Sequence, residues 1–136
     1  MMQFFDTNVL IYGFVKNVDD KHQQQTSINL IENALSSDSF VVSDIVLYEF
    51  AFVANKLEEK KENIDNFLKF LSTFSKQSNS MIANRTLELL NESSLYKSSF
   101  DINHLAFCEF YELELVTFDK GFKSLSKYSD TKIRLL

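Results

Sequence analysis

The sequence predicts one α/β domain over residues 1–136, in which a parallel sheet is covered by helices on both faces. Short β-branched or aromatic runs alternate with longer segments of helical periodicity, a pattern typical of parallel sheets. The chain has no proline, two glycines and no repeat or Gly/Ser linker, so no internal domain boundary is expected. Apolar residues make up 45% of it, with fourteen Phe, which predicts a core rich in aromatic rings.

The first half of the chain predicts two strands and four helices. MQFF at 2–5 and FVV at 40–42 are short apolar runs expected to form strands. The helices follow at 8–16, 22–36, 44–58 and 63–75. Ser43 can cap the third of these and Asp44 suits its positive end. Asn63 is expected to begin the fourth, whose apolar stripe is Ile64, Phe67, Leu68 and Leu71.

The second half predicts three strands and two helices. EEKKE at 58–62 is interpreted as a solvated helix end, and the polar SKQSNS at 75–80 as a loop. A short strand is expected at 80–83, followed by helices at 84–94 and 101–113. The apolar run before Asp119 predicts a strand at 115–118, and a last strand is expected at 132–135.

Charge, cysteine content and hydropathy limit the function classes. The net charge of −5 argues against the broad basic surface of a non-specific nucleic-acid binder, although Lys120, Lys123, Lys127, Lys132 and Arg134 gather late in the chain. Cys108 is alone, so no disulfide can form within the chain and the thiol is interpreted as buried and inert. No apolar stretch is long enough to cross a membrane, and no signal segment is seen. We therefore expect a cytoplasmic protein.

Glu49 occupies an unusual position on the helix expected at 44–58. Its neighbours three and four residues away are Ile45, Val46, Phe52 and Val53, so its carboxylate leaves an apolar face. An isolated charge there costs several kcal/mol or takes up a proton, so a compensating group is expected. The alternative is a Glu at the helix rim that reaches water or pairs with a Lys.

Three aspartates stand at element ends. Asp6 and Asp119 follow predicted strands, and the carboxyl ends of parallel strands are where binding sites form. Asp101 stands in or just before the first turn of a predicted helix. Each also has a simpler interpretation, as a turn or cap residue.

If Asp6, Glu49, Asp101 and Asp119 converge, each repulsive pair costs roughly 3 kcal/mol at about 5 Å and an effective dielectric near 20. Protons or cations would then be needed. Oxygen-only ligands favour Mg²⁺ or Mn²⁺ over Zn²⁺, and His22 and His104 are too few for a zinc site. His104 lies one helical turn after Asp101 and can reach the pocket, but a satisfied, partly buried histidine is the preferred interpretation.

The ordered set DTNVL at 6–10, Glu49 in SDIVLYEF, DINHLA at 101–106 and TFD at 117–119 resembles the PIN-domain ribonucleases, in particular the VapC-type toxins of type II toxin-antitoxin pairs. The resemblance covers nearly the whole chain. It implies a three-layer α/β/α sandwich with a central parallel sheet, an acid cluster binding Mg²⁺ or Mn²⁺, and endonucleolytic cleavage of RNA. It also implies a small antitoxin partner and a homodimer.

The same resemblance assigns roles to individual residues. Asp6, Glu49, Asp101 and Asp119 match the catalytic, metal-binding acids, while Asn8 and Thr117 match positions that orient the acids. Ser43 sits where a small hydroxyl residue is common. Many relatives carry a further acid where this chain has Gly121, which puts a second tightly held metal in doubt.

The implied reaction is attack of an activated water on the phosphate, with Asp101 or Asp119 accepting a proton, to give 5′-phosphate and 3′-hydroxyl ends. Lys16, Lys120 and Lys123 are candidates for attracting RNA to the negative cluster. Three alternatives remain open. A receiver-like domain would need an acidic pair after the first strand, which is not seen. The others are a PIN-fold binding module with weak or no activity, and a free-standing RNA-processing nuclease without an antitoxin.

Overall fold

The computed structural model describes residues 1–136 and has the predicted α/β architecture. Five parallel strands form one sheet in the order β3-β2-β1-β4-β5. Their bounds are Gln3–Phe5 for β1, Phe40–Ser43 for β2, Ser75–Lys76 for β3, Glu114–Thr117 for β4 and Ile133–Leu135 for β5. β1 is central, with Phe4 aligned to Val41 on one side and to Leu115 on the other.

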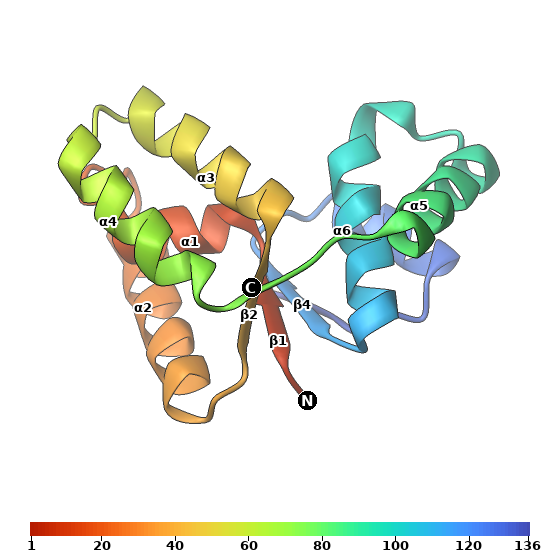
Figure 1. Ribbon diagram of the computed structural model, residues 1–136, viewed down its shortest axis with the longest axis horizontal. Coiled ribbons are helices and arrows are strands. Elements are labelled where there is room, and N and C mark those ends of the chain that lie inside the picture. Colours follow the sequence, from red (N-terminus) through yellow and green to blue (C-terminus); the bar gives the residue numbers. More distant parts are fainter.

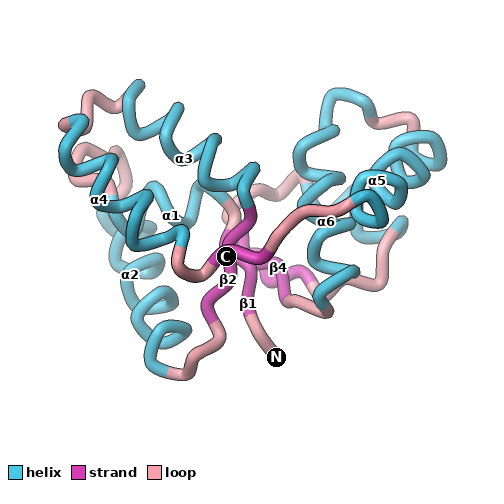
Figure 2. The backbone as a smooth tube through the Cα atoms, viewed as in Figure 1, coloured by secondary structure: helices cyan, strands magenta, loops and turns pink.

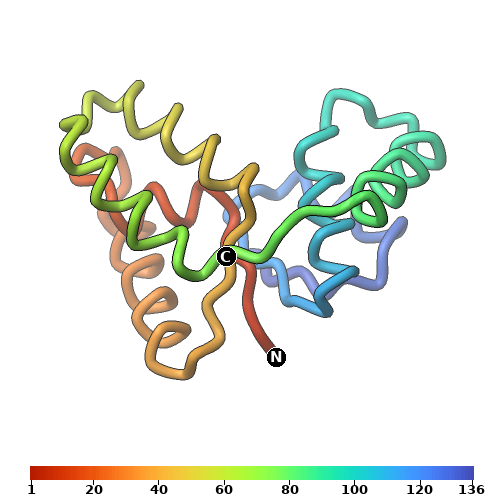
Figure 3. The backbone as a smooth tube through the Cα atoms, in the orientation of Figure 1, coloured from red at the N-terminus to blue at the C-terminus, as the bar shows by residue number.

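Helices cover the two faces of the sheet in chain order. On one face lie α1 (Thr7–Phe14), α2 (Lys21–Ser36), α3 (Asp44–Lys56) and α4 (Lys61–Ser72), and on the other α5 (Ser80–Ser93) and α6 (Ser99–Tyr111), as Figure 1 shows. Figure 2 shows the strands gathered between the two groups. The chain passes from one group to the other after β3 (Figure 3). The predicted three-layer sandwich is confirmed.

Short helices complete the chain. Tyr96–Ser98 forms a 3-10 helix before α6, while α7 (Phe122–Leu125) and a 3-10 helix at Ser126–Tyr128 connect β4 to β5. No helix is both long and apolar enough to pass through a membrane.

One continuous core of 28 buried apolar residues fills the space between sheet and helices. The predicted aromatic interior is confirmed, since the largest fully buried side chains include Phe4, Phe5, Phe50, Phe107 and Phe122. Phe5 stacks on Phe40 across β1 and β2, with 5.1 Å between ring centroids. These contacts fix the central strands whose ends carry Asp6 and Asp119.

The third strand was placed wrongly by the sequence pattern. Residues 80–83 begin α5, because the Asn79 side chain caps the Ile82 N–H at 3.0 Å and Ile82, Thr86 and Leu89 are buried with helical spacing. The strand is instead Ser75–Lys76, in the segment expected to be a loop. Its polar residues suit an edge strand that pairs only with β2.

The start of the fourth helix also differs from the prediction. Asn63 does not cap it, because the helix begins two residues earlier at Lys61. The Asn63 amide donates to Glu59 Oε1 at 2.8 Å instead of accepting a helix N–H. Ser43 does cap α3, accepting from the Val46 N–H at 3.2 Å, as predicted.

Candidate active site

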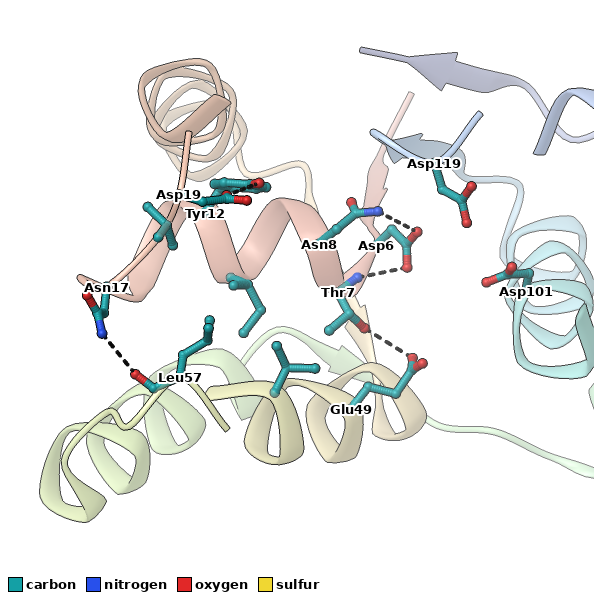
Figure 4. A pocket seen from close by; sticks show the side chains of 13 residues that line it. Asp6, Thr7, Asn8, Tyr12, Asn17, Asp19, Glu49, Leu57, Asp101 and Asp119 are labelled. Carbon is teal, nitrogen blue, oxygen red and sulfur yellow. Dashed lines mark hydrogen bonds between the residues drawn. The ribbon is translucent and has the colours of Figure 1, made fainter. Parts of the chain in front are cut away.

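A cavity of about 470 Å³ opens at the carboxyl ends of β1 and β4. Its walls come from both helix groups and include Asp19 and the four predicted acids, Asp6, Glu49, Asp101 and Asp119 (Figure 4). β1 and β4 pair directly, so Asp6 and Asp119 leave neighbouring strands at the same edge. Side chains far apart in sequence therefore share one pocket.

Asp6 is the most firmly held acid. It is 6% exposed and caps α1, its Oδ1 accepting from the Thr7 N–H at 2.8 Å. Its Oδ2 accepts from Thr117 Oγ1 at 2.7 Å and from Asn8 Nδ2 at 3.4 Å. Burial raises the pKa of Asp6 despite the opposing effects of His104, the Thr117 hydroxyl and the Thr7 N–H. The cap interpretation and the cavity position both hold for this residue.

Asn8 and Thr117 connect Asp6 to the Asp119 segment. Thr117 Oγ1 accepts from the Asp119 N–H at 2.9 Å, and Asn8 Oδ1 accepts from the Phe118 N–H at 3.3 Å. The two side chains also meet, with Asn8 Nδ2 3.4 Å from Thr117 Oγ1. Both lie where residues that orient the acids would be needed.

Asp119 is exposed, and its carboxylate contacts the backbone of its own loop. Its Oδ1 accepts from the Gly121 N–H at 2.8 Å. A Cβ added at Gly121 would lie 3.0 Å from that oxygen, closer than side chains normally approach. Glycine therefore permits this turn, and an acid at position 121 would require the Asp119 carboxylate to shift.

Glu49 projects from α3 with its side chain 34% exposed. Its Oε1 accepts from Thr7 Oγ1 at 3.1 Å and lies 3.1 Å from His104 Nε2. Burial would raise the pKa of Glu49, but the hydrogen bond and charge of His104 and the bond from Thr7 outweigh it, so the pKa is lowered. The expected compensating group is thus a histidine and a threonine, and no lysine pairs with Glu49.

Asp101 faces the other acids from the first turn of α6, half-buried. No hydrogen bond joins it to another cavity side chain in Figure 4. Burial, followed by repulsion from Asp6 and smaller effects of Asp119 and Glu49, raises its pKa to about 6 despite His104. The N-cap position of α6 is Ser98, so Asp101 is not the cap.

Two residues of this site, His104 and Thr7, were not assigned to it by the sequence analysis. His104 is 0% exposed and lies against Glu49 and Asp6, whereas a satisfied, partly buried histidine was expected. Its Nδ1 is buried without a partner. Thr7, directly after Asp6, holds both Asp6 and Glu49. The spacing of His104 from Asp101 had indicated that this ring can reach the pocket, and no signal in the sequence indicated Thr7.

The other predicted site residues lie outside the acid cluster. The Ser43 hydroxyl is used as the α3 cap and contacts no carboxylate, so it does not directly select the oxygens that face a metal. Lys16, Lys120 and Lys123 are exposed and are not part of the cavity wall. Two of them are next to cavity residues in the chain: Lys16 precedes Asn17, and Lys120 follows Asp119.

The donor set suits a hard divalent cation, because five carboxylates, two amides and the hydroxyls of Thr7 and Tyr12 line the cavity. The raised pKa of Asp101 also fits a site that requires positive charge. However, no group of three acid, histidine or cysteine side chains is arranged closely enough to hold an ion. The acids surround a space and do not converge on one point.

Comparison with known proteins places these features in context. The model of a protein family described as PIN domain matches residues 4–128. A search of curated proteins finds no match. Among solved structures, a chain of a toxin-antitoxin complex from Klebsiella pneumoniae is 27% identical with a TM-score of 0.63, covering 88% of this chain and 89% of that chain.

Two further structures share the fold at lower identity. A chain of VapBC2 from Rickettsia felis, crystallised with a promoter DNA fragment, is 19% identical with a TM-score of 0.70, covering 100% of this chain and 99% of that one. A chain of FitAcB from Neisseria gonorrhoeae is 15% identical with a TM-score of 0.69, covering 97% and 96%. The length and fold of this chain match those of proteins from toxin-antitoxin complexes.

Proposed function

This chain belongs to the PIN domain family, and on that basis we propose that it is an endoribonuclease that cleaves RNA phosphodiester bonds with Mg²⁺ or Mn²⁺. The observation that carries the proposal is that Asp6, Glu49, Asp101 and Asp119 line one cavity although they come from four separate elements. Similarity to a chain of a toxin-antitoxin complex supports a role as the toxin of such a pair.

The four acids would hold the cation, with Asn8 and Thr117 orienting Asp6. When bound, a divalent cation neutralises phosphate charge and lowers the pKa of water. Thr117 and Thr7 each donate to an acid, so they limit the positions that the carboxylate oxygens can take. Because Gly121 replaces a further acid, one tightly held metal is proposed.

Asp101 is proposed to accept a proton from the attacking water. Its pKa of about 6 is close to neutral, which suits a group that must take up and release a proton. Water attacks phosphorus and loses a proton to Asp101, the bond from phosphorus to the 3′ oxygen breaks, and that oxygen takes up a proton from solvent, so the products carry 5′-phosphate and 3′-hydroxyl ends. Asp119 is the alternative acceptor, since it is exposed at the same cavity.

Substrate RNA needs positive charge beside this negative cavity. Lys120 directly follows Asp119, and Lys123 lies three residues further in α7. Lys16 lies beside Asn17 of the cavity wall. We propose that these three exposed lysines contact RNA phosphates.

The test is cleavage of a mixed RNA substrate with Mn²⁺ or EDTA. Wild-type protein should cut only with Mn²⁺, and Asp6→Asn should lower the rate by about 100-fold or more, since a ligand is lost. Asp65→Asn, which changes an exposed acid of α4, is the matched control and should cut normally. Metal-dependent cutting that survives Asp6→Asn would identify a contaminating nuclease and contradict the proposal.

A PIN-fold binding module with weak or no activity is the second candidate. The separation of the acids favours it, because no three of them are arranged to hold an ion. RNA that shifts in fluorescence anisotropy with the protein but stays intact in Mn²⁺ would support this candidate.

The proposed partner is a small antitoxin. The cavity continues from the acids along Ile11, Val53 and Leu57, so an apolar segment bearing one basic side chain would match its chemistry. Co-expression with a short reading frame encoded beside this one, followed by co-purification, tests the pairing. Absence of such a frame would favour a free-standing RNA-processing nuclease. We also propose a homodimer, which sedimentation would test.

A further inference from the structure

His104 is a fully buried histidine between two acids of the cavity. Its Nε2 lies 3.1 Å from Glu49 Oε1 and 3.8 Å from Asp6 Oδ1. Its ring packs on Phe4 with 5.3 Å between ring centroids. Such a polar ring in an apolar wall requires a compensating interaction, which the carboxylates supply.

The contacts define which ring nitrogen carries hydrogen. Carboxylate oxygens only accept, so the Nε2 that faces Glu49 must be the donor. The Nδ1 is buried and has no partner. The contacts therefore require hydrogen on Nε2, whether the ring is neutral or charged.

Two donors hold Glu49 through a single oxygen. Thr7 Oγ1 on α1 and His104 Nε2 on α6 both bind Oε1. The second oxygen, Oε2, is therefore left for a ligand in the cavity. Because Glu49 is 34% exposed and close to Asp6, a carboxylate without these donors could turn toward water.

We propose that His104 is a positioning residue, which fixes Glu49 so that its free oxygen is available to a divalent cation. The proposal rests on the proposed metal-dependent function and adds a residue that reaches from α6 to α3. These helices lie on opposite sides of the sheet (Figure 1), so His104 also links the two helix groups across the cavity.

Mn²⁺ affinity measured by electron paramagnetic resonance tests the role without requiring cleavage. His104→Gln keeps an amide nitrogen at the Nε2 position, whereas His104→Asn is polar but too short to reach Glu49. The Asn variant should bind Mn²⁺ about 10- to 100-fold more weakly, as is typical when a residue orienting a ligand is lost. The Gln variant should stay close to wild type.

Cys108→Ala is the matched control, because Cys108 lies on α6 one turn further, is as buried as His104 and makes no hydrogen bond to Glu49. It should bind Mn²⁺ like wild type. The positioning role would be overturned if all variants bound Mn²⁺ with equal affinity. It would also be overturned if the Gln variant or the Cys108→Ala control lost as much Mn²⁺ affinity as the Asn variant. Wild-type protein that binds no Mn²⁺ would overturn the proposed function as well. Normal Mn²⁺ binding without RNA cleavage would overturn the proposed function alone.

A measurement on the wild-type protein avoids any folding defect of the variants. Long-range proton–nitrogen NMR spectra report the tautomer of each histidine, and His22→Gln assigns the signals because the chain has two histidines. We expect His104 of the metal-free protein to carry hydrogen on Nε2. A hydrogen on Nδ1 alone would overturn the proposal, because Nε2 could not donate to Glu49.

Discussion

The four predicted acids of the cavity differ in how much their charge is compensated by neighbours. Asp6 receives three hydrogen bonds and Glu49 receives two. Asp101 is desolvated by burial and repelled by the other acids, with only His104 opposing these effects, so its pKa rises to about 6. Asp101 is thus the acid whose ionisation most opposes folding in the absence of metal.

The first prediction concerns the pH dependence of stability in EDTA. The folded pKa of Asp101, about 6, lies above its ordinary value of 3.8, so between these pH values the folded state binds the proton more tightly. The contribution of Asp101 to the free energy of unfolding is therefore fully present below about pH 4 and is lost as the pH rises to about 6. Asp101→Asn should reduce that loss in urea unfolding at pH 4, 5, 6 and 7.

The comparison variant is Asp65→Asn, an exposed acid of α4. It should follow the wild-type pH profile. If the stability of Asp101→Asn changed with pH in the same way as that of wild type, the surroundings of Asp101 would not raise its pKa and the prediction would be wrong.

The second prediction concerns Thr117, which is 0% exposed and donates to Asp6 Oδ2. Thr117→Val keeps the shape but removes the donor to Asp6 and the acceptor of the Asp119 N–H. The free energy of unfolding should fall by about 1.5–3 kcal/mol, the range for hydrogen bonds to charged groups. Urea denaturation measures the change.

Thr86→Val is the control for Thr117, because Thr86 is also buried but its hydroxyl donates to the uncharged Ile82 carbonyl. Its cost should be about 1 kcal/mol. A Thr117 variant no less stable than the Thr86 variant would mean that the Asp6 bond contributes little.

Helix α3 shows how an element start controls the site. β2 passes directly into α3, and Ser43 is both the last residue of the strand and the helix cap. The first turn is thereby fixed relative to the sheet, and Glu49 follows on the cavity side. Ser43 therefore supports Glu49 through the helix and not through a contact with a carboxylate.

The third prediction is that Ser43→Ala lowers the free energy of unfolding by about 1 kcal/mol, because the Val46 N–H loses its acceptor. Ser98→Ala is matched to it, since Ser98 occupies the N-cap position of α6 without a side-chain cap bond. It should change stability by less than about 0.5 kcal/mol. Chemical denaturation measures both, and equal losses would contradict the role of the Ser43 hydroxyl.

Across the protein, the strand order β3-β2-β1-β4-β5 decides which acids meet. It pairs β1 with β4. The helices α3 and α6 lie on opposite faces of the sheet, and both begin near the same end of it (Figure 1). The cavity is consequently built from both helix groups. A ligand that binds there should stabilise the entire fold.

The fourth prediction is that Mn²⁺ raises the unfolding temperature. Binding only to the folded state contributes about 2.7 kcal/mol at a free concentration about 100 times Kd, enough to shift the midpoint by several degrees. Differential scanning fluorimetry measures the shift. Asp6→Asn should show a much smaller one, and an equal shift in both proteins would place the metal elsewhere.

Local patterns were enough to predict much of the fold and the positions of the acids. Apolar runs located β1, β2, β4 and β5, and spacing located most helices to within a few residues. They failed at 75–83, where a polar edge strand has no apolar signal and MIA reads equally as a strand or a helix. The acids were found because charge beside apolar runs is visible in sequence.

Residues close together in the chain were enough to predict the α/β class, the aromatic core, the Ser43 cap, three aspartates at element ends and Glu49 on an apolar helix face. The three-dimensional arrangement was needed to show that Glu49 is held by His104, 55 residues away, and by Thr7, 42 residues away. It also decided that the acids surround a cavity without converging. The physical reason is that hydrogen bonds and repulsion depend on distances in space, which the pairing of β1 with β4 and the two helix layers set.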